Sequence, residues 1–271
     1  MACAAAGWRL SQFRTSEKSG PVAVSSGSVT APAQATTKEA SAPEPAEKEP
    51  APGDNPRVVK WVFSAAAGVE MARNEVTLDA YKMCYHAGAC SLDGVDSVVY
   101  KRGGAHYQGS CHWNDYQPDH ADIFDRMNPM NCVSVSDAEA FCDWVGGRLP
   151  TYAEWVAEAT NGGQRAYPWG NEKPSCERAV VLDDPMEPGC GKHWWKVCSK
   201  PLGNSASGLC DMIGNVSEYV SKDGGYFEVG GSDVKGFEEL ESANLLRGSA
   251  VGSDQRDDRF GFRCVRNPVP R

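Results

Sequence analysis

The sequence has few histidines and no concentration of positive charge. Only five histidines occur among the 271 residues, and the 27 Lys and Arg residues form no basic run within a chain of formal net charge −9. Nucleic acids and anionic membrane surfaces are bound through basic patches, so we expect neither as a partner. A cationic or neutral ligand is more compatible with this charge.

Long apolar stretches and Cys-x-x-Cys pairs are also absent. Because no run of about 18 apolar residues occurs, we expect no transmembrane helix. The eleven cysteines lack the spacing of zinc ribbons and thioredoxin-like sites, which favours disulfides. Disulfides indicate an oxidising compartment, and we therefore expect an extracytoplasmic protein of the periplasm or cell surface.

The first ten residues, MACAAAGWRL, do not make a complete signal peptide, because Arg9 interrupts a short apolar run. We expect the export signal to be missing from this start. Cys3 has two interpretations. It is either the end of a lipoprotein-type cleavage box carrying a lipid anchor, if the true start lies upstream, or an incidental cysteine.

The composition changes near residue 57. Ala, Pro, Ser, Thr, Glu and Lys dominate from about Thr15 to Arg57, without apolar periodicity. Such a segment has too little apolar surface to fold. We predict a disordered N-terminal tail and linker over residues 1–57 and one folded domain over residues 58–271.

Three helices are indicated by capping residues followed by an apolar stripe. We expect the first to be capped by Thr77 and to run through Tyr85, and the others to start at the capping boxes Ser136–Glu139 and Thr151–Glu154. The strongest strand patterns are YPWGN, LLRGSA and FGFRCVR. A few short helices among strands and turns predict an α+β domain.

Several motifs then occur in a fixed order along the chain. They are NPMNCVSVSDAEAFCDWVGGRLPTYAEWVAEATNGGQRAYPWGN, PLGNSASGLCDMIGNVSEYV, LLRGSA and GFRCVR. Together they resemble the formylglycine-generating-enzyme, or sulfatase-modifying-factor, family from about residue 75 to residue 266. The resemblance implies a C-type-lectin-like fold with little regular secondary structure, which agrees with the α+β prediction. It also implies a disulfide between Cys142 and Cys264, whereas the pairing of the other cysteines stays open.

The resemblance fails at the catalytic metal. Catalytic members bind copper through two cysteines near the C-terminus and oxidise a substrate cysteine to formylglycine. Here the corresponding stretch, Val251–Arg259, contains no cysteine. We therefore expect no copper site and assign no catalytic residue, and whether the chain is an enzyme stays open.

A structural calcium ion is implied by another motif. Asp211, Gly214, Val216 and Glu218 resemble the family's calcium loop, with side-chain oxygens at its ends and backbone carbonyls between them. Such hard oxygen ligands suit calcium. The alternative is that Asp211 and Glu218 are ordinary turn and surface carboxylates.

Two further groups of residues are candidates for a binding site. Trp194 and Trp195, with Arg247, are a candidate ligand cleft, although most tryptophans in such a fold belong to the core. The cluster of His106, His112 and His120 is better interpreted as part of a solvated loop than as a metal site.

Three hypotheses about function follow. The first is a non-catalytic binding or accessory module on a calcium-braced scaffold, with an unknown protein or glycan as ligand. The second is a metal-dependent oxidoreductase related to the formylglycine-generating enzyme, and the third a purely structural surface protein. The oxidoreductase would use another metal or a set of charged residues that comprises Arg247, Asp254, Arg256, Asp257 and Arg259.

Overall fold

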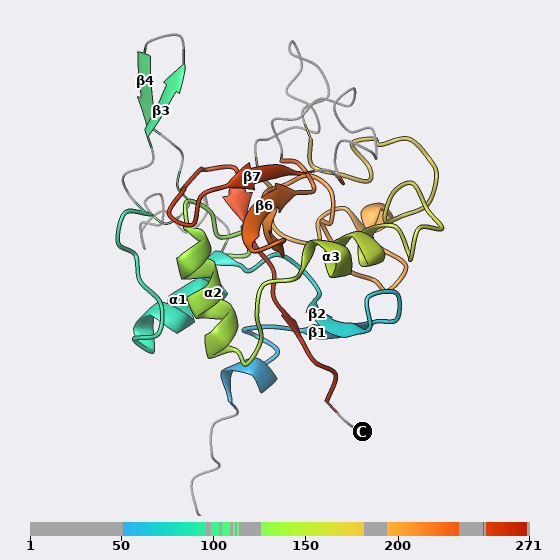
Figure 1. Cartoon of the computed structure of the whole chain (residues 1–271), viewed down its shortest axis with the longest axis horizontal. Helices are drawn as coiled ribbons and strands as arrows, with labels where there is room; N and C mark the ends of the chain where they lie inside the picture. The colour runs from blue at the N-terminus through green and yellow to red at the C-terminus, as the bar shows by residue number, and fades with distance from the viewer. Residues whose placement is uncertain are drawn as a thin grey trace, which may run out of the picture. The chain divides into compact units, whose positions relative to one another are not determined.

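Short helices and strands are joined by long irregular segments in this domain (Figure 1). The computed structural model describes residues 51–95, 99–102, 105–108, 111, 113, 126–181, 194–232, 246 and 248–269, and residues 99–102 and 105–108 only by their backbone. All of these belong to one unit of the chain, Lys48–Arg271. The predicted α+β class is confirmed.

Each of the three described α-helices begins at a side-chain cap. Helix α1 (Leu78–His86) is capped by Thr77, and α3 (Tyr152–Ala159) by the Thr151–Glu154 capping box, as the sequence predicted. Helix α2 (Val135–Trp144) begins earlier than predicted, because its capping box is formed by Ser134 and Asp137. The Asp137 carboxylate accepts both the backbone N–H and the hydroxyl of Ser134, so an aspartate takes the place expected for a glutamate.

The strands form two sheets and a separate hairpin. The first sheet joins β1 (Trp61–Ser64), β2 (Val69–Ala72) and β9 (Val265–Arg266) in that order. The second has the order β7-β6-β5-β8, and the hairpin pairs β3 with β4. Their bounds are Ser249–Val251 for β7, Gly225–Val229 for β6, Ser217–Lys222 for β5, Phe260–Gly261 for β8, Val99–Arg102 for β3 and Ala105–Gln108 for β4.

The strand predictions hold only in part. FGFRCVR contributes two strands, β8 and β9, separated by three residues, and LLRGSA supplies the start of β7. YPWGN is no strand: Tyr167 and Gly170 form an isolated bridge across a tight turn. The turn brings the Tyr167 and Trp169 rings into a parallel stack with centroids 5.1 Å apart.

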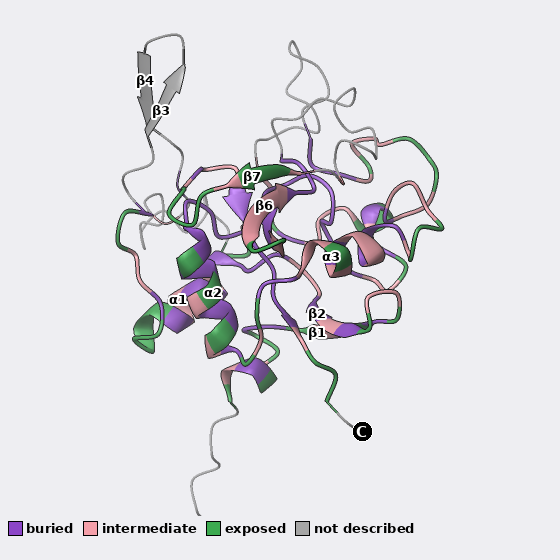
Figure 2. Ribbon diagram, in the orientation of Figure 1, coloured by how far each residue is buried: buried purple, intermediate pink, exposed green. Residues whose placement is uncertain are grey.

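Two buried clusters make the core, and purple segments in Figure 2 mark where the helices and central strands contribute to it. In the first cluster, Tyr81 of α1 packs on Phe141 of α2 and on Phe262 beyond β8. In the second, Trp155 of α3 is completely buried. The apolar stripes expected for these helices are therefore buried only in part: Leu78 and Tyr81 of α1 are buried, whereas Tyr85, expected on the same face, is 41% exposed.

Disulfides join segments that are distant in the sequence. Cys142 of α2 is bonded to Cys264, the pair that the family resemblance implied. The other printed pairs are Cys84–Cys90, Cys111–Cys132 and Cys198–Cys210, and Cys176 is also disulfide-bonded. All nine cysteines in the described part of the chain are thus oxidised.

The described domain includes residues before the expected boundary at Val58. A single 3-10 turn, Pro52–Asp54, contains the buried Gly53, whose carbonyl accepts a hydrogen bond from the Trp61 indole. A Cβ at Gly53 would lie 2.1 Å from the Val145 carbonyl oxygen, so this close approach requires glycine. A second 3-10 turn covers Pro201–Gly203. Among the described helices, none has the length and apolar character to cross a bilayer.

Candidate functional site

An ion pair lies at the centre of the domain, between β5 and the segment that joins β8 to β9. Arg263 donates from Nε and Nη2 to the two carboxylate oxygens of Glu218, at 2.7 and 2.5 Å. The Trp155 indole donates to the same carboxylate at 2.9 Å. The side chains of Arg263 and Glu218 are 0% and 1% exposed. Burying an ion pair costs desolvation energy, which is offset only where further hydrogen bonds satisfy the remaining donors and acceptors. Arg263 donates four more hydrogen bonds, all to backbone carbonyls.

Two more buried carboxylates surround this pair. The Glu75 carboxylate accepts from the Asn215 amide at 2.7 Å and from the Val216 backbone N–H at 3.1 Å. Asp211 accepts from the Cys198 backbone N–H at 2.5 Å. Burial, strengthened by nearby negative charge, raises the pKa of Glu75 well above its usual value. Burial also raises the pKa of Asp211 to about 6, against the lowering effect of the Cys198 hydrogen bond. The Arg263 guanidinium therefore acts on three carboxylates, and Arg73 adds a second positive charge that acts on Asp211.

The residues of the expected calcium loop can be compared with this geometry. Asp211 fits a cation site, because only one of its oxygens accepts a hydrogen bond among the described residues. Glu218 fits less well, because Arg263 already occupies both of its oxygens. Gly214 has φ of 82°, and a Cβ there would lie 2.4 Å from the Val180 carbonyl oxygen, so the turn requires glycine. Val216 contributes its backbone N–H to Glu75.

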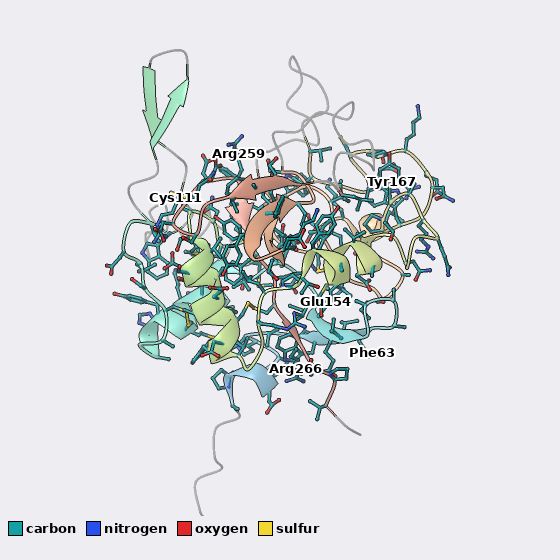
Figure 3. The ribbon with its side chains drawn as sticks, in the orientation of Figure 1. Phe63, Cys111, Glu154, Tyr167, Arg259 and Arg266 are labelled. Atoms are coloured by element: carbon teal, nitrogen blue, oxygen red, sulfur yellow. A yellow bond between two sulfur atoms is a disulfide. The ribbon has the colours of Figure 1, made fainter. Side chains whose placement is uncertain are left out.

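The charged loop, Val251–Arg259, occupies the place where the family resemblance implies copper ligands. Arg256 is ion-paired to Asp137 of α2 at 2.5 Å, and Arg259 to Asp257 at 2.6 Å. Arg259 lies at the surface, where Figure 3 labels it. The loop offers these charges, an exposed Asp254 and no sulfur. Arg256 therefore joins the loop to α2, whereas Arg259 is paired within the loop.

Few side chains in the described part could replace the missing thiolates. All its cysteines are disulfide-bonded, and His86 is the one histidine whose side chain is described. Within that part, one group of possible ligand atoms lies within 4.8 Å of one another: Cys198, Cys210 and Asp211. The two sulfurs of this group form a disulfide and are not thiolate ligands.

The candidate aromatic cleft is only partly visible. Trp195 is half-buried, exchanges two hydrogen bonds with the Asn215 side chain, and lies beneath the Lys200 ammonium, 4.0 Å from the ring centroid. Its indole N–H has no partner among the described residues. Trp194 is also half-buried. Arg247 and the clustered histidines His106, His112 and His120 lie outside the side chains that the structure describes.

The sequence analysis missed Glu75 and Arg263 as members of this centre. Both carry a signal that was available, because Glu75 opens the EVTLDAY segment and Arg263 lies within GFRCVR. A charged residue inside an otherwise apolar motif indicates a buried partner. The sequence does not indicate which partner, since Glu218 and Glu75 lie 45 and 188 positions before Arg263.

A family comparison decides what this arrangement belongs to. The sulfatase-modifying factor enzyme 1-like domain matches residues 10–268. The chain belongs to this family. The formylglycine-generating enzyme of Mycobacterium tuberculosis is 36% identical over 153 residues, which cover 53% of this chain and 50% of that protein.

Other relatives in the sulfatase-modifying factor family carry different names. The hercynine oxygenase of Mycobacterium tuberculosis is 33% identical over 106 residues, covering 38% of this chain and 24% of that protein. The inactive C-alpha-formylglycine-generating enzyme 2 of Bos taurus is 31% identical over 154 residues, covering 51% and 50%. The chain therefore spans between a quarter and half of the length of these curated relatives.

Solved structures agree on the fold. PvdO from Pseudomonas aeruginosa has a TM-score of 0.54 and 21% identity, over 73% of this chain and 80% of that chain. CarF has a TM-score of 0.50 and 23% identity, over 74% and 87%. The fold predicted from the resemblance is confirmed, and the numerous disulfides fit an extracytoplasmic member of the family.

Proposed function

We propose that this protein is a non-catalytic binding or accessory module of the sulfatase-modifying factor family, which acts outside the cytoplasm on a protein or glycan ligand. The observation that carries the proposal is the state of sulfur: every described cysteine is in a disulfide, and the charged loop has none. Cu(I) prefers soft sulfur ligands, which the aspartates and arginines of this loop do not provide.

The relatives are compatible with this proposal. One of them is named as an inactive member, so loss of the reaction has precedent in the family. Hercynine oxygenase and the formylglycine-generating enzyme are named as enzymes, which keeps a metal-dependent oxidoreductase as the competing function. The described residues favour the module, because Arg256 is paired with Asp137 of α2 and Arg259 with Asp257 of the loop itself, which leaves both cationic side chains engaged.

The test is oxidation of a cysteine in a sulfatase-type peptide. Purified full-length protein is given copper and a reductant under nitrogen, air is admitted, and the peptide mass is followed. The Mycobacterium tuberculosis formylglycine-generating enzyme serves as the positive control. We expect no aldehyde product and no stoichiometric binding of copper or iron. Metal-dependent product formation would establish the oxidoreductase instead.

A structural calcium ion is part of the proposal. The buried excess of carboxylate over guanidinium supports it, because a divalent cation beside Asp211 would offset charge that burial disfavours. Asp211 and the carbonyls of Gly214 and Val216 would hold the ion, and Glu218 would have to share its oxygens with Arg263. The ion would brace the loop without taking part in a reaction.

Calcium is tested by thermal unfolding after removal of metal with a chelator. At a calcium concentration about 100 times the dissociation constant, we expect a stabilisation of about 2.7 kcal/mol that magnesium does not reproduce. Asp211→Asn should abolish the response, and Asp254→Asn, the same change at an exposed position of the charged loop, should retain it. An equal response in both variants would exclude this site.

The proposal also places the ligand cleft. Trp194, Trp195 and Arg247 would line it, and the indole N–H of Trp195, which has no partner among the described residues, supports this.

A lipid anchor is the last part of the proposal. Cys3 would carry a lipid if a signal precedes it. Cell fractionation and labelling with a fatty-acid analogue test the anchor: Cys3→Ser should remove the label, and a label that persists would exclude this cysteine.

A further inference from the structure

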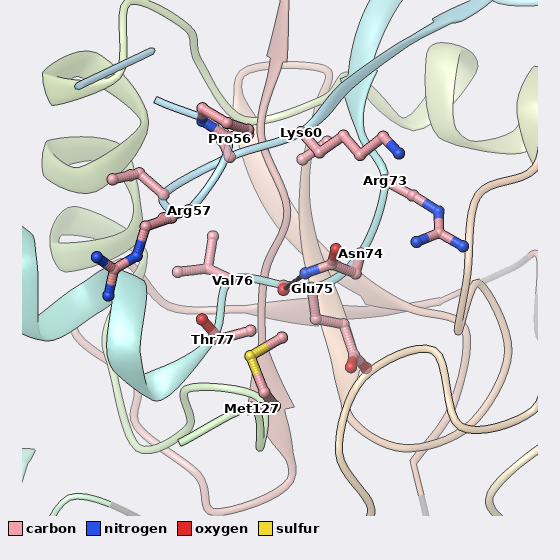
Figure 4. Close-up of a pocket in the computed structure, with 12 residues that line it drawn as sticks. Pro56, Arg57, Lys60, Arg73, Asn74, Glu75, Val76, Thr77 and Met127 are labelled. Atoms are coloured by element: carbon pink, nitrogen blue, oxygen red, sulfur yellow. Dashed lines mark hydrogen bonds between the residues drawn. The ribbon is translucent and has the colours of Figure 1, made fainter. Parts of the chain in front are cut away.

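A pocket lies beside the first sheet, between the segment that leads into β1 and the segment that joins β2 to α1 (Figure 4). It is a small, partly open hollow, and Met127 completes its lining. None of its lining residues belongs to the charged loop, the calcium motif or the candidate aromatic cleft.

Three cations line this pocket. Lys60 and Arg73 extend on one side of it and Arg57 lies on the other, as Figure 4 shows. Among the described residues, none of these three side chains has a hydrogen bond or an ion pair. The arginines 148, 256, 259, 263 and 266 are, in contrast, all paired with carboxylates. The pocket therefore gathers three cations that pair with no described carboxylate, in a chain whose net charge is −9.

Arg73 is the most informative of the three. It is half-buried, and a guanidinium that is partly removed from water requires acceptors. Its positive charge lowers the pKa of Asp211, although no hydrogen bond joins the two side chains among the described residues. Arg73 therefore keeps its donors available for an anion in the pocket.

The floor of the pocket is apolar. Val58 and Val76 are buried there, and the exposed Met127 adds a flexible apolar wall. The one carboxylate that lines the pocket, Glu75, has both oxygens occupied by the Asn215 amide and the Val216 N–H. The Glu75 carboxylate is thus bonded to interior groups, and the other charged side chains that line the pocket are the three cations.

We propose that this pocket binds a small organic carboxylate with a short hydrocarbon part. Lys60 and Arg73 hold the carboxylate through charge-assisted hydrogen bonds, and the hydrocarbon lies on Val58, Val76 and Met127. Arg57 adds long-range attraction from the opposite rim. The site goes beyond the binding-module proposal, because a small carboxylate is neither a protein nor a glycan, and it does not depend on the absence of catalysis.

The experiment uses straight-chain carboxylates from acetate to hexanoate as probes, with inorganic sulfate as a second arm. Binding to the isotope-labelled full-length protein is followed by amide chemical shifts. We expect affinity to rise with chain length until the apolar lining is covered, by up to about fourfold per fully buried methylene. Sulfate binding more tightly than hexanoate, or no dependence on chain length, would show a purely electrostatic ion site and overturn the proposal.

Charge variants assign the site. Lys60→Gln combined with Arg73→Gln should weaken hexanoate binding about tenfold or more, because it removes both charge-assisted donors. Lys173→Gln, an exposed cation outside the pocket, is the matched control and should leave binding unchanged. Equal affinity in the double variant and the control would place the carboxylate elsewhere. The peptide-oxidation assay reads a different property, so failure of one proposal does not imply failure of the other.

Discussion

Two consecutive segments near the C-terminus place charge in opposite surroundings. The charged loop, residues 251–259, keeps its ion pairs at or near the surface, where the Arg259 side chain is 39% exposed. The closing segment, residues 260–266, holds Arg263 with no exposure at all and bonds Cys264 to α2. Arginine therefore forms ion pairs in both segments, near the surface in the charged loop and in the interior in the closing segment.

The two segments differ in what they contribute: the closing segment supports the fold, and the charged loop lies where the family resemblance implies the metal ligands of the reaction. The closing segment is joined to β5, β2 and α2, so its residues are fixed by the fold. The charged loop bears mainly on α2, through the Asp137–Arg256 pair, and can change sequence at small cost in stability. A family member can thus lose a metal site in this loop and keep its fold.

The largest expected effect tests the covalent part of the closing segment. Replacing Cys142 and Cys264 together with alanine opens a loop of 122 residues and should cost about 5 kcal/mol in the chain-entropy model. The same change at Cys84 and Cys90, which are 6 residues apart, should cost only about 2 kcal/mol. Urea unfolding measures both, and equal losses would contradict the central role given to the first pair.

The next effect tests the buried ion pair. Arg263→Met leaves Glu218 buried without its partner and should lower the free energy of unfolding by about 3–5 kcal/mol. Adding Glu218→Gln should recover part of the loss, because the uncompensated charge is then removed. A loss below about 1 kcal/mol in the single variant would mean that water reaches this centre.

Sequence reasoning succeeded where structure is local and failed where it is not. The helix starts at Thr77 and at the Thr151–Glu154 box were predicted correctly, because a cap depends only on residues about three positions apart. The start of α2 was misplaced by two residues because serines stand at both 134 and 136, and only the reach of Asp137 distinguishes them. Strand β5 was not predicted, since four successive residues of it are buried and no alternation marks it.

The candidate site was predictable to a similar extent. Asp211 and Glu218 were found through a motif, and the structure adds that Arg263 and Glu75 meet them. That meeting depends on strand order, because β8 pairs in parallel with β5 and so brings Arg263 beside Glu218. No local pattern encodes such a contact between distant segments.

A smaller effect is expected in the charged loop. Arg256 pairs with Asp137 where the side chains are 19% and 10% exposed, and Arg256 also donates to the Cys132 carbonyl. Arg256→Gln should cost about 1 kcal/mol, and Arg259→Gln less than about 0.5 kcal/mol. Thermal unfolding of the two variants measures the difference. If Arg259→Gln proved the more damaging, the loop would be anchored through Asp257 rather than through α2.

The smallest effect concerns pH at the start of α3. Partial burial opposes ionisation of Glu154, but hydrogen bonds from the Arg148 guanidinium and from Thr151 outweigh it and lower the pKa of this carboxyl. Because the folded pKa lies below the unfolded one, the stabilisation is present above about pH 4.5 and is lost as pH falls through the folded pKa. Arg148 is 46% exposed, so solvent screening limits the effect to well under about 1 kcal/mol. Arg148→Gln should lower the unfolding free energy more near neutral pH than at a pH below the folded pKa of Glu154, where the carboxyl is protonated. Lys173→Gln, which removes an equally positive but exposed side chain, controls for net charge, and a loss from Arg148→Gln that is the same at both pH values would show that Arg148 acts through packing instead of through the Glu154 charge.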